Sequence, residues 1–403
     1  MAVLGAAGGG GGQVIEEHIL ISSQTFVPPR DGKVNIIVVG GGGAGAKRFS
    51  ATNGGFAAGG GAGGYCEYRD LDVTTSGSYT VVIGAGGAAT YSSSNENGAA
   101  GGQSTVAGTG LSATLTANGG SGGAHGDSNA VVAGGAGGTA SNGTANRTGG
   151  AGGGIPNSSS LSSSCSMAGG GGAVAINSAT GYAGGSVIST SGGYGANKYY
   201  ACGGAGIGGR GGGVNGGDAY GATSYGGQGG HSAGPGQDFP TTQAAEQTFI
   251  PGAEDDGGKW MNHQYAGVRL DGRTIGHVGW QGNDDAHYLV QPGVADSINP
   301  MTAWNSYSNL RTNQFTAPMG AGGGGGCPPD HQTGTFYAGA CGTAFGGGGG
   351  TVIEAANGYT QLRTGDGGLG GGGGGIRSLH AGAANMNGAG GDGVVIFRYT
   401  SFT

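Results

Sequence analysis

The sequence is short of the residues that build a conventional protein core. Only 9% of its 403 residues are charged, and Leu, Ile, Val and Phe together number 60. That is about 15% of the chain, below the share expected of an ordinary globular domain. Such a composition is typical of disorder unless something other than side-chain burial orders the backbone. We therefore exclude an average enzyme fold and predict that dense main-chain hydrogen bonding orders the chain.

Three further absences limit what the protein binds and where it acts. No Lys or Arg tract accompanies the net charge of −7, so neither nucleic acid nor an anionic membrane is expected as a partner. No run approaches the roughly 18 apolar residues of a membrane-spanning helix, so membrane insertion is not expected. The start of the chain has no basic region followed by an apolar one, so we expect no secretory export.

The cysteines give no sign of a metal site or a disulfide framework. There are five of them, and none forms a Cys-x-x-Cys pair of the kind that binds zinc. We interpret them as mostly free, buried thiols. A bridge between Cys327 and Cys341 stays open as an alternative. No cofactor and no metal is expected.

What the chain has in abundance is glycine, 108 residues against only 11 prolines. Collagen needs glycine at every third position together with abundant proline, and the tracts here have neither. A polyproline II helix without proline keeps its N–H groups, so helices that lack side chains can approach and hydrogen-bond laterally. The composition therefore favours a bundle of glycine-rich polyproline or polyglycine II helices. The competing hypothesis is a small β-sandwich that carries long glycine-rich loops.

Glycine is unevenly distributed and divides the chain. It is dense in 1–237 and again in 319–403, and it is sparse in 238–318. The middle part also holds all three tryptophans and most of the net negative charge. We predict an N-terminal attachment segment at 1–29, a glycine-rich domain at 30–237, an inserted Gly-poor module at 238–318 and a glycine-rich return at 319–403.

Short strands are predicted at both ends of the glycine-rich parts. The β-branched run 33–39 is of strand length and is bounded by turn residues. Residues 65–73 and 79–83 flank a turn and predict a hairpin. The run 393–399 predicts a closing strand that pairs with 33–39 or with the hairpin. The fold class is thus mainly β and irregular, with a polyglycine II bundle flanked by short antiparallel strands.

Two motifs that suggest catalysis or nucleotide binding are explained by composition. Residues 40–45 fit G-x-G-x-x-G after a strand, but no amphipathic helix with an acidic residue follows. Residues 119–123 fit G-x-S-x-G, again without the strand and helix of a nucleophile elbow. A polysaccharide-degrading enzyme would need paired carboxylates, for which Asp255 and Asp284 are the candidates. We predict no catalytic residue and no enzymatic activity.

The aromatic residues of the middle segment are the predicted binding residues. Aromatic rings among amides and carboxylates are suited to recognition of a carbohydrate or a protein surface. Packing into a small core of the segment itself is an equally weighted alternative for each of them. The candidates for receptor binding are Trp260, Tyr265, Trp280, Tyr288, Trp304 and Tyr307.

The strand-bearing ends carry a resemblance to known proteins. The order 25–28, 34–43, 63–67, 79–87 and 391–396, with glycine runs after the strands, resembles the glycine-rich domains of bacteriophage tail-fibre and receptor-binding proteins. Phage adhesins of the T-even type pack polyglycine II helices and bind host surface molecules with the connecting loops. The single insert of about 80 residues is larger than the loops of that type.

The resemblance implies a virion protein that is made in the host cytoplasm and exposed after lysis. We expect a tail-fibre or tail-tip adhesin that recognises a host surface glycan or outer-surface protein. Its other partners would be tail or fibre proteins, and a homotrimer is one assembly that fibres adopt. The alternative is a structural subunit of a head fibre, a decoration or an extracellular filament that binds no receptor.

Overall fold

The structure is a computed structural model and describes most of the glycine-rich chain. The statements below concern residues 2–3, 16–49, 55–127, 131–154, 166–176, 178–189, 199–207, 210–211, 214–215, 224–226, 266–268, 274–276, 342, 345–353, 364–378 and 385–402. Throughout these residues the regular secondary structure is β, with no α-helix. The prediction of a mainly β and irregular chain is thus confirmed. Within these ranges, no helix could cross a membrane.

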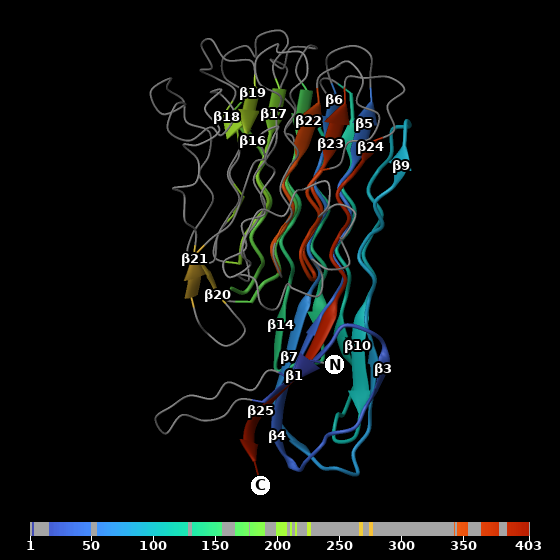
Figure 1. Cartoon of the computed structure of the whole chain (residues 1–403), viewed down its shortest axis with the longest axis vertical. Coiled ribbons are helices and arrows are strands. Elements are labelled where there is room, and N and C mark those ends of the chain that lie inside the picture. The colour runs from blue at the N-terminus through green and yellow to red at the C-terminus, as the bar shows by residue number, and fades with distance from the viewer. Residues whose placement is uncertain are drawn as a thin grey trace.

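A β-sandwich forms one end of the elongated molecule, at the bottom of Figure 1. Its first sheet is antiparallel, with strands in the order β1 (Ala2–Val3), β2 (Glu17–Leu20), β25 (Val394–Phe402), β4 (Gly32–Val39), β7 (Tyr65–Val73) and β14 (Ala145–Arg147). The closing strand β25 pairs with β4 from Val394 opposite Val39 to Phe402 opposite Gly32. The predicted pairing of the chain's last strand with residues 33–39 is therefore confirmed.

The second sheet of the sandwich is also antiparallel. Its order is β13 (Ala140–Ser141), β11 (Leu115–Ala117), β10 (Ser104–Gly108), β8 (Tyr79–Val82) and β3 (Gln24–Phe26). The predicted hairpin of 65–73 with 79–83 is wrong, because β7 pairs with β4 and β14 while β8 pairs with β10 and β3. The turn between them crosses from one sheet to the other. Leu71 and Tyr79 can in this way bury their side chains in the same core.

The core between the two sheets is small and aromatic in part. Along β8, Tyr79 and Val81 are buried while Thr80 and Val82 are exposed, the alternation of a strand with one solvated face. The Phe26 and Phe397 rings stack with centroids 4.1 Å apart, and Tyr79 meets Phe397 edge-on at 5.4 Å. This core gives the glycine-rich part a foundation of ordinary side-chain packing.

The glycine tracts run lengthwise from the sandwich to the opposite end of the molecule (Figure 1). Their N–H groups are donated to other tracts in a regular order. In residues 40–46, the N–H groups of Gly40, Gly43 and Ala46 donate to residues of 58–64. Those of 41 and 44 donate to 99–102, and those of 42 and 45 to 388–391. Successive residues therefore bond to three different neighbours, and every third residue returns to the same one.

The same period of three governs the next tract. In residues 58–64, positions 58, 61 and 64 donate to the tract 118–124, positions 59 and 62 to 150–153, and positions 60 and 63 to 370–373. The two tracts 40–46 and 58–64 run antiparallel, whereas 118–124 lies parallel to 40–46, since Gly120 donates to Gly41 and Gly123 to Ala44. Both directions are therefore accommodated in one bundle.

Close approach of the tracts explains the demand for glycine. A Cβ atom placed on Gly42 would overlap the carbonyl oxygen of Gly371, which belongs to a neighbouring tract. Some alanines of the tracts, such as Ala44 and Ala62, are buried, but others and one serine occupy outward positions where they are exposed. These positions include Ala85, Ala88, Ala100, Ser121, Ala133, Ala136, Ala151 and Ala183.

The returns of the tracts at the sandwich end carry larger apolar residues. Val174, Phe345 and Leu369 are buried in one cluster with Ile37 and Val39 of β4. Phe345 has a φ of 72° and the following return passes through Gly370 at 69°, so both turns use the left-handed region. Each return is thereby fixed to the outer face of the first sheet.

Short strands lie at the opposite end of the bundle, at the top of Figure 1. One sheet has the order β12 (His125–Gly126), β6 (Gly55–Ala57), β15 (Ser166–Ala168), β17 (Tyr199–Ala201) and β19 (Ser224–Gly226), and another has β22 (Thr351–Ile353), β23 (Ile376–Ser378) and β5 (Lys47–Phe49). Two separate two-stranded sheets lie at the same end: β24 (Asn385–Met386) pairs with β9 (Tyr91–Ser92), and β16 (Val187–Ser189) pairs with β18 (Val214–Asn215). We call this region the strand-capped end.

Of the segment 238–318, the structure describes one antiparallel pair, β20 (Ala266–Val268) with β21 (Thr274–Gly276). The proposed boundaries of this segment and of the other domains stay predictions.

Candidate functional site

The predicted receptor-binding residues lie outside the described residues. This holds for Trp260, Tyr265, Trp280, Tyr288, Trp304 and Tyr307. Their role stays a prediction, as does the bridge between Cys327 and Cys341.

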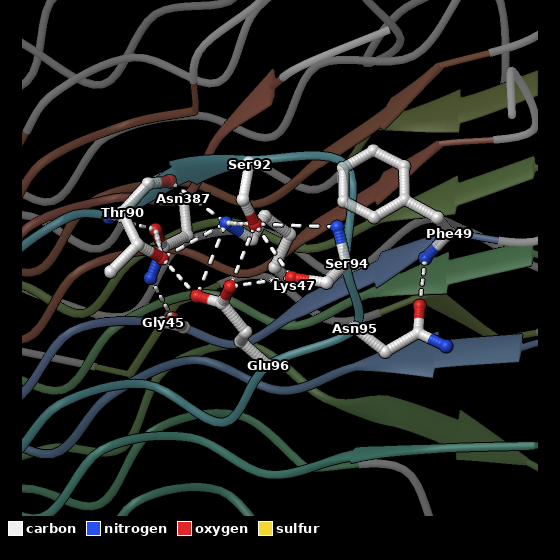
Figure 2. A network of polar contacts seen from close by, with 9 residues as sticks. All are labelled: Gly45, Lys47, Phe49, Thr90, Ser92, Ser94, Asn95, Glu96 and Asn387. Atoms are coloured by element: carbon white, nitrogen blue, oxygen red, sulfur yellow. Dashed lines mark hydrogen bonds and ion pairs between the residues drawn. The ribbon is translucent and has the colours of Figure 1, made fainter. Parts of the chain in front are cut away.

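A polar network at the strand-capped end is the best-defined cluster of side chains. It begins at β5, which follows the glycine tract 40–46 directly. The Lys47 side chain has no solvent-exposed surface. Its Nζ atom donates to the carbonyl oxygen and the Oγ1 atom of Thr90, each at 2.9 Å, and to Ser92 Oγ at 2.8 Å. Figure 2 shows the ammonium group enclosed by these oxygens.

Glu96 supplies the countercharge, with its Oε2 atom 3.3 Å from Lys47 Nζ. Hydrogen bonds from the hydroxyl groups of Thr90, Ser92 and Ser94, together with the charge of Lys47, lower the pKa of Glu96 to about 2. Burial lowers the pKa of Lys47, and the charge of Glu96 opposes this shift. The two side chains form an ion pair in which hydroxyl groups complete the coordination of both partners.

Two asparagines fasten this network to the bundle (Figure 2). Asn387 accepts from the Thr90 N–H at 2.7 Å and donates to the Gly45 carbonyl at 2.6 Å. Asn95 accepts from the Phe49 N–H at 2.6 Å. In addition, the backbones of Lys47 and Glu96 bond to each other in both directions. The loop 90–96 is therefore held at both its ends and its centre.

The role that this network fits is structural. Lys47 is enclosed and its donors are engaged, so it has no access to a substrate as a nucleophile or base. What the network does is fix the loop 90–96, whose Tyr91 is 50% exposed. Sequence reasoning overlooked these residues. The sequence does contain a lysine directly after a glycine tract and a carboxylate within a run of serines and asparagines. The distance between them along the chain follows no known motif, so nothing in the sequence connects the two.

The residues of the glycine motif at 40–45 are part of a tract of the bundle. Each N–H group from Gly40 to Gly45 donates to a carbonyl of another tract at 2.8 to 3.0 Å. These N–H groups are therefore engaged within the protein, whereas a dinucleotide site presents its loop N–H groups to the pyrophosphate. Ser121 of the second motif likewise lies in a tract, where its N–H donates to Ala136 and its carbonyl accepts from Gly61.

Among the described cysteines, Cys66 is free and buried, as predicted, and Cys202 is buried as well. Burial is the main cause that raises the pKa of Cys66 to about 11. In the ranges that the structure describes, no group of three or more His, Cys, Asp or Glu side chains could hold a metal ion.

Comparison with known proteins places the chain in a family. The profile of a glycine-rich domain family matches residues 20–246. This range is more than half of the chain, so the protein belongs to that family of glycine-rich domains. It includes the sandwich strands β3, β4, β7 and β8 and the tracts between them. No curated protein matches the sequence.

Proposed function

We propose that the glycine tracts form a bundle of polyglycine II helices. The support is the hydrogen-bond period of three in the tracts 40–46 and 58–64. A helix with three residues per turn and no internal hydrogen bonds directs its N–H groups to three sides in succession. Neighbours on three sides would then receive every third group. A crystal structure in which these tracts keep the backbone angles of polyproline II would support this geometry, and extended β angles would contradict it.

We further propose that the protein is a non-enzymatic virion component, a tail-fibre or tail-tip adhesin that recognises a host surface glycan or outer-surface protein. The observation that carries this proposal is the separation of the two ends. A sandwich lies at one end of the bundle, and short strands lie at the other (Figure 1). A rigid bundle lowers the entropy cost of ordering the loops that contact a receptor.

The network of Lys47 and Glu96 supports the same proposal. It holds a surface loop at the strand-capped end with buried charge and a set of hydrogen bonds, although a freely moving loop would need none of them. Several copies of such an end on one particle would bind through avidity even where each contact is weak.

Binding of the purified full-length protein to intact candidate host cells tests the proposal. A variant in which 238–318 is replaced by a short Gly-Ser linker is measured beside it. If the variant folds but no longer binds, recognition is assigned to the aromatic segment 238–318. If both proteins bind equally, recognition is assigned to the loops of the bundle. If neither protein binds, and particles contain the chain in hundreds of copies, the structural-subunit alternative replaces the adhesin.

A further inference from the structure

A second polar cluster, formed by two arginines and a histidine, lies at the strand-capped end next to the Lys47 network. Arg48 of β5 and Arg377 of β23 are register partners on adjacent parallel strands. The Arg377 side chain is fully buried, and that of Arg48 is 13% exposed. Both reach toward Gly55 of β6, where a Cβ atom would lie 3.1 Å from the Nε atom of each. The Nε atoms of both arginines therefore lie beside Gly55, and a side chain at this position would crowd them.

His125 is the third side chain of this cluster, and its imidazole offers a ring N–H group. It lies on β12, opposite Ala57 of the neighbouring strand β6. Burial, and next the charge of Arg48, lower the pKa of His125. Within the described part of the chain, the buried Nδ1 atom of His125 has no hydrogen-bond partner, nor does the buried Nε atom of Arg48.

The adjacent residue Lys47 shows how fully this fold can satisfy a buried cation. Lys47 has a carboxylate and three further oxygens around its Nζ atom. Arg48 has an ion pair of its Nη2 atom with Asp127, whose side chain is 77% exposed. An exposed carboxylate compensates little of the cost of burying charge. Arg48 is therefore supplied with less negative charge than Lys47.

From this contrast we propose that Arg48, Arg377 and His125 form a binding site for a phosphate or carboxylate group. Guanidinium groups present paired N–H donors that match the oxygens of both anions. Asp127, which pairs with Arg48, competes with an external anion for this site and is displaced when the anion binds. The site does not depend on the protein being an adhesin.

The binding of inorganic phosphate and of acetate tests this site, at constant ionic strength, by the NMR shifts of the His125 ring and by calorimetry. We expect saturable binding at one site. Arg48→Gln should weaken it at least tenfold. The matched control is Arg69→Gln, which removes one positive charge from the 53% exposed Arg69 of β7, paired with Glu67. This control should bind as the wild type does.

A second variant keeps the test decisive if Arg48→Gln fails to fold. Asp127→Asn changes an exposed side chain and removes the competing carboxylate, so it should tighten anion binding at least threefold. The proposal is overturned if the His125 signals do not shift with either anion, if the Arg69 control loses as much as Arg48→Gln, or if Asp127→Asn binds no more tightly than wild type.

A competition experiment with host cells distinguishes the source of the anion. Phosphate that binds and also displaces the protein from host cells identifies an acidic group of the cell surface as the ligand. Phosphate that binds without displacing it identifies a free anion. If the protein binds phosphate but no cells, the anion site stands and the adhesin proposal fails.

Discussion

A single methyl group placed inside the bundle should separate tracts that now touch. Gly152 is buried, and its N–H donates to the Gly135 carbonyl at 2.8 Å. A Cβ atom at this position would overlap the carbonyl oxygen of Gly59. Relief requires a shift on the order of 1 Å, which stretches this hydrogen bond and the 3.0 Å bond from Gly59 to Gly153 beyond useful length.

The expected effect of Gly152→Ala follows from three contributions. Two weakened hydrogen bonds cost about 1 kcal/mol each, and overpacking costs about 1–3 kcal/mol. The lower entropy of the unfolded alanine chain offsets about 0.4–1 kcal/mol. We therefore expect a loss of about 2–5 kcal/mol in the free energy of unfolding, measured by urea denaturation.

The neighbouring residue provides a matched control. Ala151 belongs to the same tract but is exposed, so Ala151→Ser should change the free energy of unfolding by less than about 0.5 kcal/mol. A Gly152→Ala protein that is as stable as the wild type, or more stable, would refute the argument that packing between tracts requires glycine.

Three further predictions concern titration and reactivity. The lowered pKa of Glu96 means that the unfolded chain takes up the proton first, so stability should fall as the pH drops from about 4.5 to about 2. Since the side chain is 32% exposed, we expect roughly 1–2 kcal/mol in acid unfolding curves, and Glu96→Gln should remove this part. His18 is buried beside Phe26, and burial lowers its pKa, so stability should decline as the pH falls below 6.5, and His18→Gln should flatten that decline in thermal melts. The buried Cys66 thiol should react with a thiol reagent only at the rate of unfolding, and rapid labelling of the native protein would contradict this.

The strand prediction succeeded where local pattern and burial agree, and failed where the partner lay far away in sequence. The β-branched run 33–39 and the closing strand at 393–399 are strands, and they pair with each other. The hairpin failed because a turn between two alternating segments has the same local pattern whether the chain folds back within a sheet or crosses a core. Only the distant strands β10 and β14 decide between these outcomes.

The polar clusters could not be predicted because their members are scattered. Lys47, Glu96 and Asn387 come together only when the tracts are aligned side by side, which depends on hydrogen bonds between glycines. Arg48 and Arg377 lie near opposite ends of the sequence and become neighbours through one parallel pairing. A bundle of nearly identical tracts gives no local signal of which tract lies beside which.

Amide hydrogen exchange tests the central claim most directly, namely that the glycine tracts bond laterally to one another. Residue-resolved exchange in 40–46 and 58–64 should show every consecutive N–H protected to an extent similar to that of β4 and β25, because each donates to a different neighbouring tract. Exchange of these amides at the rate of an unstructured chain, with protection confined to the sandwich strands, would contradict the account and leave glycine-rich loops on a small β-sandwich.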